Sequence, residues 1–308
     1  MGTAKQIASL TEKMKAMSIW GIGAIREKIS EIMRNVKARK WEMFSPAGHR
    51  IVFDMKTRLM AILNLTPDSF FEGSRVDEGK IIERAEKFLA DGAYILDVGA
   101  ESTRPGATPV SESEEAGRLL PALRILRREF PDALISVDTY KAEVARLSAG
   151  EGADIINDIS GFGFDSDMAG TVAGLKIPYV LSHIEGTPSD MAKYESHDNI
   201  LGDVHRYFAS KLSELEEAGV SRGNVILDPG LGFGKSAGDN FSVLKNVESL
   251  CVFGRPVMIG HSRKRFTGGL SGTLGVTAVM AGRVSLIRVH DVAENVAALR
   301  VADGIQGA

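Results

Sequence analysis

The sequence predicts an α/β protein built as a TIM (β/α)8 barrel, on the strength of three observations. First, short apolar runs of strand length alternate with amphipathic helical patterns from Leu59 onward. Second, eight such units fit into roughly 250 residues, the usual size of this barrel. Third, a polar residue stands at the carboxyl end of each apolar run, where a parallel barrel places its functional groups. A doubly wound open sheet is the alternative, but such sheets more often stop at about five to seven strands.

The composition fits one large α/β domain or two smaller ones. The chain has 308 residues, of which 44% are hydrophobic and 25% charged. A net charge of −3 gives no indication of a basic surface for nucleic acid, and no apolar run is long enough for a membrane span. A single cysteine, Cys251, excludes an internal disulfide, and we find no secretory signal pattern. We therefore expect a cytoplasmic protein.

Residues 1–41 are expected to form an amphipathic helical extension. Apolar residues recur at spacings of mostly three and four between Ile19 and Val36, with Arg, Lys and Glu between them. We expect this helix to pack on the main domain or on a second subunit. Binding to a membrane surface is disfavoured, because Glu27 and Glu31 share the polar face with the basic residues.

The main domain is expected to span 42–308 and to open with a β-hairpin at about 42–56. Its turn is Ser45-Pro46-Ala47-Gly48, and such a hairpin could cover the bottom of the barrel. Glycines that would end a helix precede several strands, as Gly92 and Gly152 do. The barrel strands are predicted at about 59–64, 93–99, 133–138, 153–159, 177–182, 224–228, 256–260 and 284–289, with helices between them, for example at 78–90, 112–128, 198–218 and 291–302.

The first barrel strand runs into the heptad Asn64-Leu65-Thr66-Pro67-Asp68-Ser69-Phe70. Pro67 fixes its own backbone and biases Thr66 away from helical geometry, so the chain must leave the strand as an irregular loop. The heptad carries an amide, two hydroxyls, a carboxylate and an aromatic ring. Taken alone, the heptad fits a ligand site and an ordinary polar turn equally well, because turns are also rich in Asn, Asp, Ser and Pro.

Polar residues follow the other seven strands too. In a parallel barrel these ends converge on one face, and helix capping alone hardly explains eight of them. Some members have a simpler interpretation: Asp291 as a helix N-cap, His183 as a satisfied core histidine and Arg263 as an ion-pair partner. The polar strand ends are Asp97, Asp138, Asn157 with Asp158, His183, Asp228, the run His261-Ser262-Arg263-Lys264, and Arg288 with His290 and Asp291.

The predicted face suits a polar heterocycle joined to an anionic, phosphorylated group. Asp138, Asn157 and Asp228 offer acceptors to an amine beside a ring N–H, as on a guanine-like or pterin ring. Asn64 is a hard oxygen ligand, which suits a Mg²⁺ ion that also holds substrate phosphates. A cationic cluster is expected in the quadrant where barrels commonly bind phosphate, and it consists of Arg263, Lys264, Arg288 and His290.

Several other kinds of site are disfavoured. The glycine-rich run 230–236 is preceded by Pro229 where a P-loop needs glycine, and it lacks the spacing of a dinucleotide fingerprint. We expect it to be a flexible loop with Phe233 available to a ligand. No Ser or Cys occupies a nucleophile elbow, and no His/Cys/Asp cluster has zinc spacing. The positioned cations point instead to charge stabilisation of a departing phosphate group.

Together, these motifs resemble those of the dihydropteroate synthase family of the folate pathway. They lie in the family's order from Leu59 to the C-terminus, and the ordered set is far more specific than any one motif. The matching stretches are 62–70 (ILNLTPDSF), 97–106 (DVGAESTRPG), 136–139 (SVDT), 156–158 (IND), His183 with 186–188 (GTP), 228–235 (DPGLGFGK), 262–264 (SRK) and 288–291 (RVHD).

The resemblance implies condensation of 6-hydroxymethyl-7,8-dihydropterin pyrophosphate with p-aminobenzoate, with release of pyrophosphate. The family mechanism is dissociative: pyrophosphate leaves first, and the aniline nitrogen then attacks the pterin-methyl cation. Family members are usually homodimers, and the resemblance implies that the chain is a target of sulfonamides. The expected partners are therefore two small molecules, with Mg²⁺ as the cofactor and without nucleic acid or membrane.

Carried over residue by residue, the resemblance assigns each part of the site. The catalytic residues are Asp138, Lys264, Arg288 and His290. The pterin would be held by Asp97, Asp138, Asn157, Asp228, Lys264 and Arg288. Asn64 would bind Mg²⁺ and, with Arg288 and His290, the pyrophosphate. The p-aminobenzoate site would be shaped by Phe70, Thr103, Arg104, Pro105, Phe233 and Ser262, under two mobile loops after the first and second strands. We expect the first loop to be disordered without ligand.

The chain also departs from the family pattern. Glu72 in the first loop replaces a usual Asp, and Ser182 stands where Met usually precedes the histidine. The segment after Lys264 is shorter than in common members, which leaves acceptor affinity and sulfonamide sensitivity open. The helical extension has no counterpart in the family pattern.

Two alternatives to a synthase remain. One is a pterin-binding methyltransferase domain, which handles no pyrophosphate and is not expected to carry the loop 103–105, the motif 262–264 and the Arg288/His290 pair together. The other is a non-catalytic pterin-binding paralogue.

Overall fold

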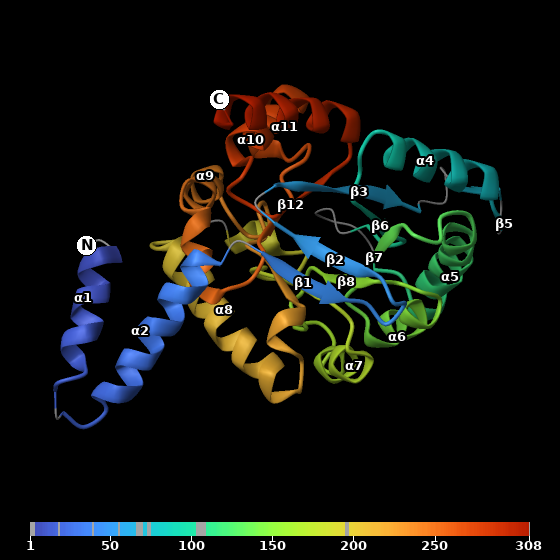
Figure 1. Ribbon diagram of the computed structural model, residues 1–308. Coiled ribbons are helices and arrows are strands. Elements are labelled where there is room, and N and C mark those ends of the chain that lie inside the picture. The colour runs from blue at the N-terminus through green and yellow to red at the C-terminus, as the bar shows by residue number, and fades with distance from the viewer. Residues whose placement is uncertain are drawn as a thin grey trace.

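The central sheet has eight parallel strands in the order β10-β9-β8-β7-β6-β3-β12-β11. A bridge between Leu227 and Val257 joins its two edges, so the sheet is a nearly closed barrel with helices around it (Figure 1). This confirms the predicted (β/α)8 barrel over an open sheet. The computed structural model describes residues 4–17, 19–38, 40–54, 56–65, 70–72, 75–102, 109–194 and 197–307.

Each barrel strand begins and ends within two residues of its predicted bounds. The strands are β3 (Arg58–Asn64), β6 (Ile95–Gly99), β7 (Leu134–Asp138), β8 (Ile155–Asp158), β9 (Tyr179–Ser182), β10 (Val225–Asp228), β11 (Met258–Ile259) and β12 (Leu286–Val289). Between and after them lie α4 (Glu78–Ala90), α5 (Glu112–Glu129), α6 (Ala142–Gly150), α7 (Met168–Leu175), α8 (Ile200–Glu217), α9 (Ala237–Lys245), α10 (Leu270–Met280) and α11 (Val292–Gln306). Short helical turns are η1 (Met191–Tyr194), η2 (Arg222–Asn224), η3 (Val247–Phe253) and η4 (Arg265–Thr267).

Side chains inside the barrel form layers, because alternate residues of a strand face the same side. The floor is a cluster of buried apolar residues near the start of each strand: Met60, Ile95, Leu134, Ile155, Val180, Ile226, Met258 and Leu286. Two residues further along, six of the strands carry a polar residue instead, namely Asp97, Ser136, Asn157, Ser182, Asp228 and Arg288. Because every second residue of a strand faces the same side, these polar groups form a layer directly above the apolar floor.

The predicted hairpin covers the bottom of this barrel. Its strands β1 (Trp41–Phe44) and β2 (Arg50–Phe53) pair antiparallel, and Met43 and Phe53 are buried in the floor cluster. Ser45 Oγ and His49 Nδ1 of its turn lie 2.6 Å and 2.7 Å from Asp154 Oδ1. The turn is therefore tied to the lower end of the barrel by a fully buried carboxylate.

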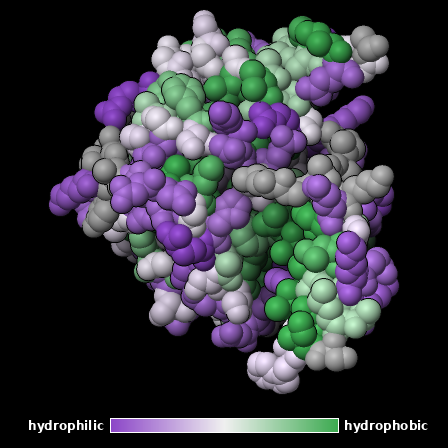
Figure 2. Space-filling model, turned by 90° about the vertical axis from the view of Figure 1, so that its left-hand side faces the viewer, coloured by the Kyte–Doolittle hydropathy of each residue, from purple (hydrophilic) through white to green (hydrophobic). Residues whose placement is uncertain are grey.

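Two helices precede the hairpin, where the sequence predicted one. They are α1 (Ala4–Met14) and α2 (Ile22–Lys37), and the C-terminal half of α2 packs on η3, with Asn35 Nδ2 donating to Val252 O at 2.8 Å. The extension thus packs on the main domain. Trp20, in the turn between the helices, is 100% exposed. Figure 2 views the molecule from the left-hand side of Figure 1 and shows apolar surface at its lower right.

After β3, the strands β4 (Phe71–Glu72) and β5 (Arg75–Val76) form a small antiparallel ladder. Within the described ranges, no helix is both long enough and apolar enough to cross a membrane. The cytoplasmic location and the division of the chain at residue 41 stay predictions.

Candidate active site

An ion-pair cluster lies at the carboxyl end of the barrel. Arg288 donates from Nε to Asp97 Oδ2 at 2.5 Å and from a terminal nitrogen to Asp138. Asp97 is fully buried and Asp138 nearly so. The carboxylates come from the adjacent strands β6 and β7, and the guanidinium comes from β12, on the other side of β3. Three of the predicted pterin residues therefore contact one another.

Asn157 lies beside this cluster and presents a free acceptor. Its Nδ2 donates to the two carboxylate oxygens of Asp97 at 3.4 Å and 3.2 Å, and this fixes the orientation of the amide because a carboxylate only accepts. Asn157 Oδ1 is buried and has no partner among the described residues; the same is true of the hydroxyls of Ser136 and Ser182. An unsatisfied buried acceptor costs about 1–3 kcal/mol. A ligand N–H or a water is needed at this place.

Burial disfavours the charged form of two acidic groups at the barrel mouth. Burial raises the pKa of Asp138 to about 7; Arg288 lowers this pKa, and Asp97 raises it further. Burial also raises the pKa of Asp228, against the hydrogen bond from Gly230 N and the charge of Lys264. Three carboxylates thus lie near Arg288, Lys264 and Lys235, and burial lowers the pKa of Lys235 to about 7. The surplus of acceptors suits a ligand that brings N–H donors or positive charge.

Lys264 follows β11 and reaches the loop after β10. Its Nζ donates to Leu231 O and lies 4.0 Å from the centre of the Phe233 ring. Burial lowers the pKa of Lys264 to about 8, while Asp228 opposes the shift. Lys264 and Phe233, assigned by the resemblance to the pterin and to p-aminobenzoate, are therefore in direct contact.

The loop 230–236 is braced, which favours an ordered loop over the flexible one that the sequence suggested. Lys235 Nζ donates to Gly230 O and Phe233 O, each at 3.0 Å, and lies 2.8 Å from His183 Nδ1. Burial lowers the pKa of Lys235 to about 7 and that of His183 to about 2, so the neutral imidazole accepts. His183 is thus the satisfied core histidine that the sequence allowed. At Gly230 (φ 65°) a Cβ would lie 1.8 Å from His183 O, so only glycine fits.

The end of β11 is tied to the end of β12. Ser262 Oγ lies 3.0 Å from His290 Nδ1 and accepts from His290 N at 3.2 Å, so Ser262 orients His290. Arg263 makes the ion pair that the sequence allowed, and its partner is Asp291. Asp291 occupies the predicted N-cap position of α11, but its carboxylate makes no cap hydrogen bond, and both its oxygens accept from the guanidinium of Arg263.

Asn64 is exposed at the end of β3. Its Oδ1 and Asp138 Oδ2 each lie 3.7 Å from the place that a Cβ would take at Gly99, so this glycine leaves the space between them open. Phe70 is partly buried against the core. Thr103, Arg104 and Pro105 lie outside the described residues, as does 66–69, so the contacts and the loop disorder expected there stay predictions.

Sequence reasoning missed Ser136 and Ser182, and it left the role of Asp158 open. The strand period gives a signal for Ser136, which stands two residues before Asp138 and so faces the same side. Asp158 is structural: it accepts from Tyr179 Oη, Ser160 N and Phe162 N at 2.6–2.8 Å. It supports the loop after β8 and leaves the ligand side to Asn157.

Comparison with known families matches residues 60–301 to the family described as "Pterin binding enzyme". The dihydropteroate synthase of Synechocystis is 38% identical, over 84% of this chain and 94% of that protein. The folic acid synthesis protein fol1 of Pneumocystis carinii is 39% identical over 81% of this chain, which spans only 36% of that longer protein.

Solved structures give the same answer. The dihydropteroate synthase of Yersinia pestis, in a sulfonamide drug complex, superposes with a TM-score of 0.79 and 33% identity, covering 87% of this chain and 100% of that one. The enzyme of Xanthomonas albilineans with 4-aminobenzoic acid gives 0.77 and 36%, covering 86% and 99%. The chain therefore belongs to the pterin-binding enzyme family and, within it, to the dihydropteroate synthases, transferases of folate synthesis.

Proposed function

We propose that the chain condenses 6-hydroxymethyl-7,8-dihydropterin pyrophosphate with p-aminobenzoate by a dissociative mechanism, giving 7,8-dihydropteroate and pyrophosphate. The observation that carries the proposal is the buried cluster of Asp97, Asp138, Asn157 and Arg288. It combines surplus acceptors with a fixed cation at one end of a barrel, where such enzymes bind their substrates.

Pterin recognition rests on the acceptors. A dihydropterin ring presents an amine and ring N–H groups as donors, which match the carboxylates of Asp138 and Asp228 and the unpaired Oδ1 of Asn157. Asp97 binds Arg288 and Asn157 rather than facing the ligand itself. Its role is to hold both of these side chains in place.

The chemical step breaks the bond between the pterin methylene carbon and the pyrophosphate oxygen. The electron pair leaves with pyrophosphate, and the cation that remains is stabilised by the ionised carboxylate of Asp138. Arg288, Lys264 and His290 offer positive charge or N–H donors to the departing anion. The nitrogen lone pair of p-aminobenzoate then forms the new C–N bond, and that nitrogen loses its proton.

Mg²⁺ fits this arrangement as a substrate-borne ion. No group of three or more His, Cys, Asp or Glu side chains within the described ranges could hold a metal by itself. Asn64 Oδ1, exposed beside Asp138, offers one hard oxygen, and Mg²⁺ is often held by one or two protein oxygens together with substrate phosphates. When bound, the ion would neutralise charge on the leaving pyrophosphate.

The acceptor site would lie between the pterin and the surface. Phe233, stacked on Lys264, and Phe70 supply apolar contacts for the benzene ring, and Ser262 contributes through His290. The 4-aminobenzoic acid complex of the Xanthomonas enzyme supports this acceptor. We also propose a homodimer, for which exposed Val279, Val301 and Ile305 on the packed pair α10 and α11 offer an apolar face.

Positional isotope exchange tests the mechanism. Pterin pyrophosphate labelled with ¹⁸O in the bridge to the methylene carbon is incubated with enzyme and Mg²⁺ but without p-aminobenzoate. If pyrophosphate departs before the acceptor attacks, it rotates and recombines, and the label spreads to non-bridging oxygens. Turnover with both substrates but no spreading of the label would instead mean a concerted displacement.

A further inference from the structure

The loop between β10 and α9 contains a buried lysine that the proposed mechanism does not use. Lys235 is only 3% exposed, and its Nζ donates to Gly230 O and Phe233 O, each at 3.0 Å. The same Nζ lies 2.8 Å from His183 Nδ1. All three acceptors are uncharged, since burial lowers the pKa of His183 to about 2.

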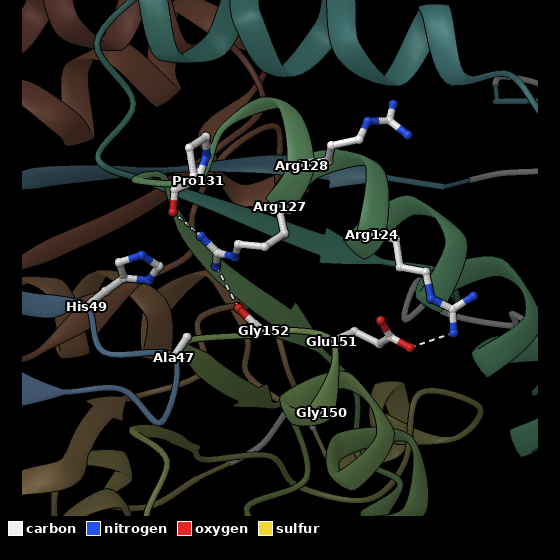
Figure 3. A pocket seen from close by; sticks show the side chains of 9 residues that line it. All are labelled: Ala47, His49, Arg124, Arg127, Arg128, Pro131, Gly150, Glu151 and Gly152. Atoms are coloured by element: carbon white, nitrogen blue, oxygen red, sulfur yellow. Dashed lines mark hydrogen bonds and ion pairs between the residues drawn. The ribbon is translucent and has the colours of Figure 1, made fainter.

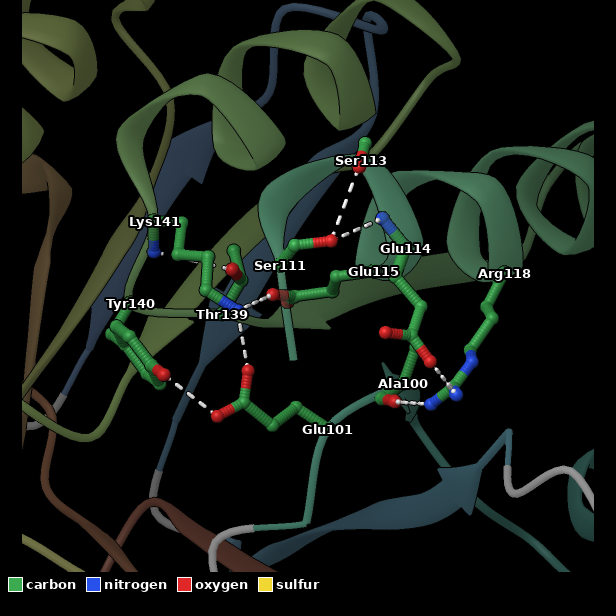
Figure 4. A network of polar contacts seen from close by, with 10 residues as sticks. All are labelled: Ala100, Glu101, Ser111, Ser113, Glu114, Glu115, Arg118, Thr139, Tyr140 and Lys141. Carbon is green, nitrogen blue, oxygen red and sulfur yellow. Dashed lines mark hydrogen bonds and ion pairs between the residues drawn. The ribbon is translucent and has the colours of Figure 1, made fainter. Parts of the chain in front are cut away.

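Another buried lysine, Lys141, has a different arrangement. It donates from Nζ to the carboxylates of Glu101 and Glu115, which balance its charge (Figure 4). An ammonium buried among uncharged acceptors costs several kcal/mol, and burial accordingly lowers the pKa of Lys235 to about 7. Stability is therefore a poor explanation of Lys235, because an apolar side chain of similar length would avoid this cost.

What Lys235 supplies is a fixed backbone in the loop. Its two carbonyl acceptors, Gly230 O and Phe233 O, stand on either side of Leu231 and Gly232 in the chain. Asn240 of α9 is a second anchor of the same loop. Its Oδ1 accepts from Gly232 N at 2.7 Å, and its Nδ2 donates to Lys235 O at 3.2 Å.

The backbone held in this way contacts Lys264 at three successive residues. Lys264 Nζ donates to Leu231 O and lies 4.0 Å from the centre of the Phe233 ring. A Cβ at Gly232 would lie 2.8 Å from Lys264 Cδ, so the aliphatic part of Lys264 lies against this glycine. The position of the Lys264 ammonium therefore depends on the conformation of the loop.

We propose that Lys235 is a positioning residue for Lys264: by holding Gly230 O and Phe233 O, it fixes the loop against which Lys264 lies. This inference rests on the proposed function, in which Lys264 binds the pterin and offers positive charge to the departing anion. Lys235 itself is buried and does not need to touch a substrate. Its effect on the reaction should therefore run through Lys264.

A double-mutant cycle tests this relation. The value of kcat/KM for the pterin pyrophosphate is measured at saturating p-aminobenzoate for the wild type, Lys235→Met, Lys264→Met and the double variant. Lys235→Met should lower it about tenfold or more, because a misplaced binding group loses much of its effect. In the Lys264→Met background the same substitution should lower it less than about twofold, since the group that Lys235 positions is gone.

Asn240→Ala is a second variant, which loosens the loop at its other anchor and leaves Lys235 in place. It should lower kcat/KM by a smaller factor than Lys235→Met does, and again only when Lys264 is present. Thermal melts establish that each variant is folded. If Lys235→Met does not fold, Asn240→Ala decides the test by the same comparison.

Arg127→Met is the matched control. Arg127 pairs with buried Asp154 at 2.9 Å and donates to Pro131 O and Gly152 O, at the opposite end of the barrel (Figure 3). Its loss should lower the Tm and leave kcat/KM within about twofold with or without Lys264. This separates a general loss of stability from a misplaced Lys264.

The inference is overturned if Lys235→Met leaves kcat/KM at the wild-type value, or lowers it by the same factor with and without Lys264. A rise in the KM for p-aminobenzoate alone would also contradict it, because the loop would then act through Phe233. If the wild-type chain itself releases no pyrophosphate with both substrates, the proposed function fails and this inference with it. A working wild type with an additive cycle removes only the role of Lys235.

Discussion

Asp97, Asp138 and Asp228 lie buried at the barrel mouth near Arg288, Lys264 and Lys235, and burial lowers the pKa of Lys235 to about 7. Burial raises the pKa of Asp138 and Asp228, which means that the folded protein holds these groups in a less favourable charged state than water would. Buried negative charge of this kind is costly in the empty site. It becomes useful when a ligand brings N–H donors or develops a positive charge, so activity and stability should separate at Asp138.

We predict that Asp138→Asn lowers kcat by about 100-fold or more, because it removes the charge that stabilises the pterin-methyl cation. Arg288 loses its ion pair with Asp138 but keeps its bond to Asp97, and the larger cost of burying the Asp138 charge disappears, so the Tm should hold or rise. Asp158→Asn is the control, since Asp158 is equally buried but accepts three structural hydrogen bonds; it should lower the Tm. A fully active Asp138→Asn enzyme would exclude the charge-stabilising role.

The pH dependence of kcat/KM for the pterin pyrophosphate should be bell-shaped. Asp138 must be ionised, and with its pKa raised to about 7 the activity falls as the pH drops through that value. Lys264 must be protonated, and with its pKa lowered to about 8 the activity falls as the pH rises through that value. Lys264→Arg should move the alkaline limb upward, because a guanidinium keeps its proton. An unchanged alkaline limb would assign it to another group.

For single residues, the sequence predicted which side chains lie at the barrel mouth but not which of them contact one another. Asp138 and Arg288 follow from their places at strand ends, yet their direct contact does not, because it joins β7 to β12 across the barrel. For Asp291 the position was predicted correctly, but the contact of its carboxylate was not. Its position before α11 indicated a cap, and only the three-dimensional approach of Arg263 revealed that its carboxylate is already engaged.

Among the elements, the strands are well predicted because their period and their glycine boundaries are local properties of the chain. Along a strand, the apolar residue of the floor and the polar residue of the next layer are two positions apart, as Ile95 and Asp97 show. The N-terminal extension was predicted less well. Its second helix has the apolar periodicity on which the prediction was based, but α1 lies before the residues that show this pattern. Trp20, between the two helices, is fully exposed, and its contacts do not explain why a tryptophan stands there.

We predict that deleting residues 1–20 leaves kcat and both KM values within about twofold of the full chain. The reason is that α2 keeps its own contacts with the barrel, through Asn35 to Val252 O and through Glu31 to Arg222. Steady-state kinetics and a thermal melt on the shortened chain check this. A large loss of activity with an unchanged melt would make the extension part of the functional unit.

For the whole molecule, the barrel brings the strand ends to one face, which is why an ordered set of weak motifs predicts a single site. Subunit assembly belongs to the same scale. We predict a homodimer by sedimentation velocity, and a monomer for the double variant Val279→Asp with Val301→Asp, since both side chains are more than 60% exposed on α10 and α11. A wild-type monomer, or a variant that still dimerises, would rule out this face.

The most direct test of the central claim, that this barrel mouth holds a pterin and expels pyrophosphate, is the rate of pyrophosphate release by the wild-type chain. The rate is measured with each substrate alone, with both, and with both after Mg²⁺ is chelated. The account predicts sustained release only when pterin pyrophosphate, p-aminobenzoate and Mg²⁺ are all present. Tight binding of the pterin without sustained release under any of these conditions would contradict it and identify the chain as a non-catalytic pterin-binding relative.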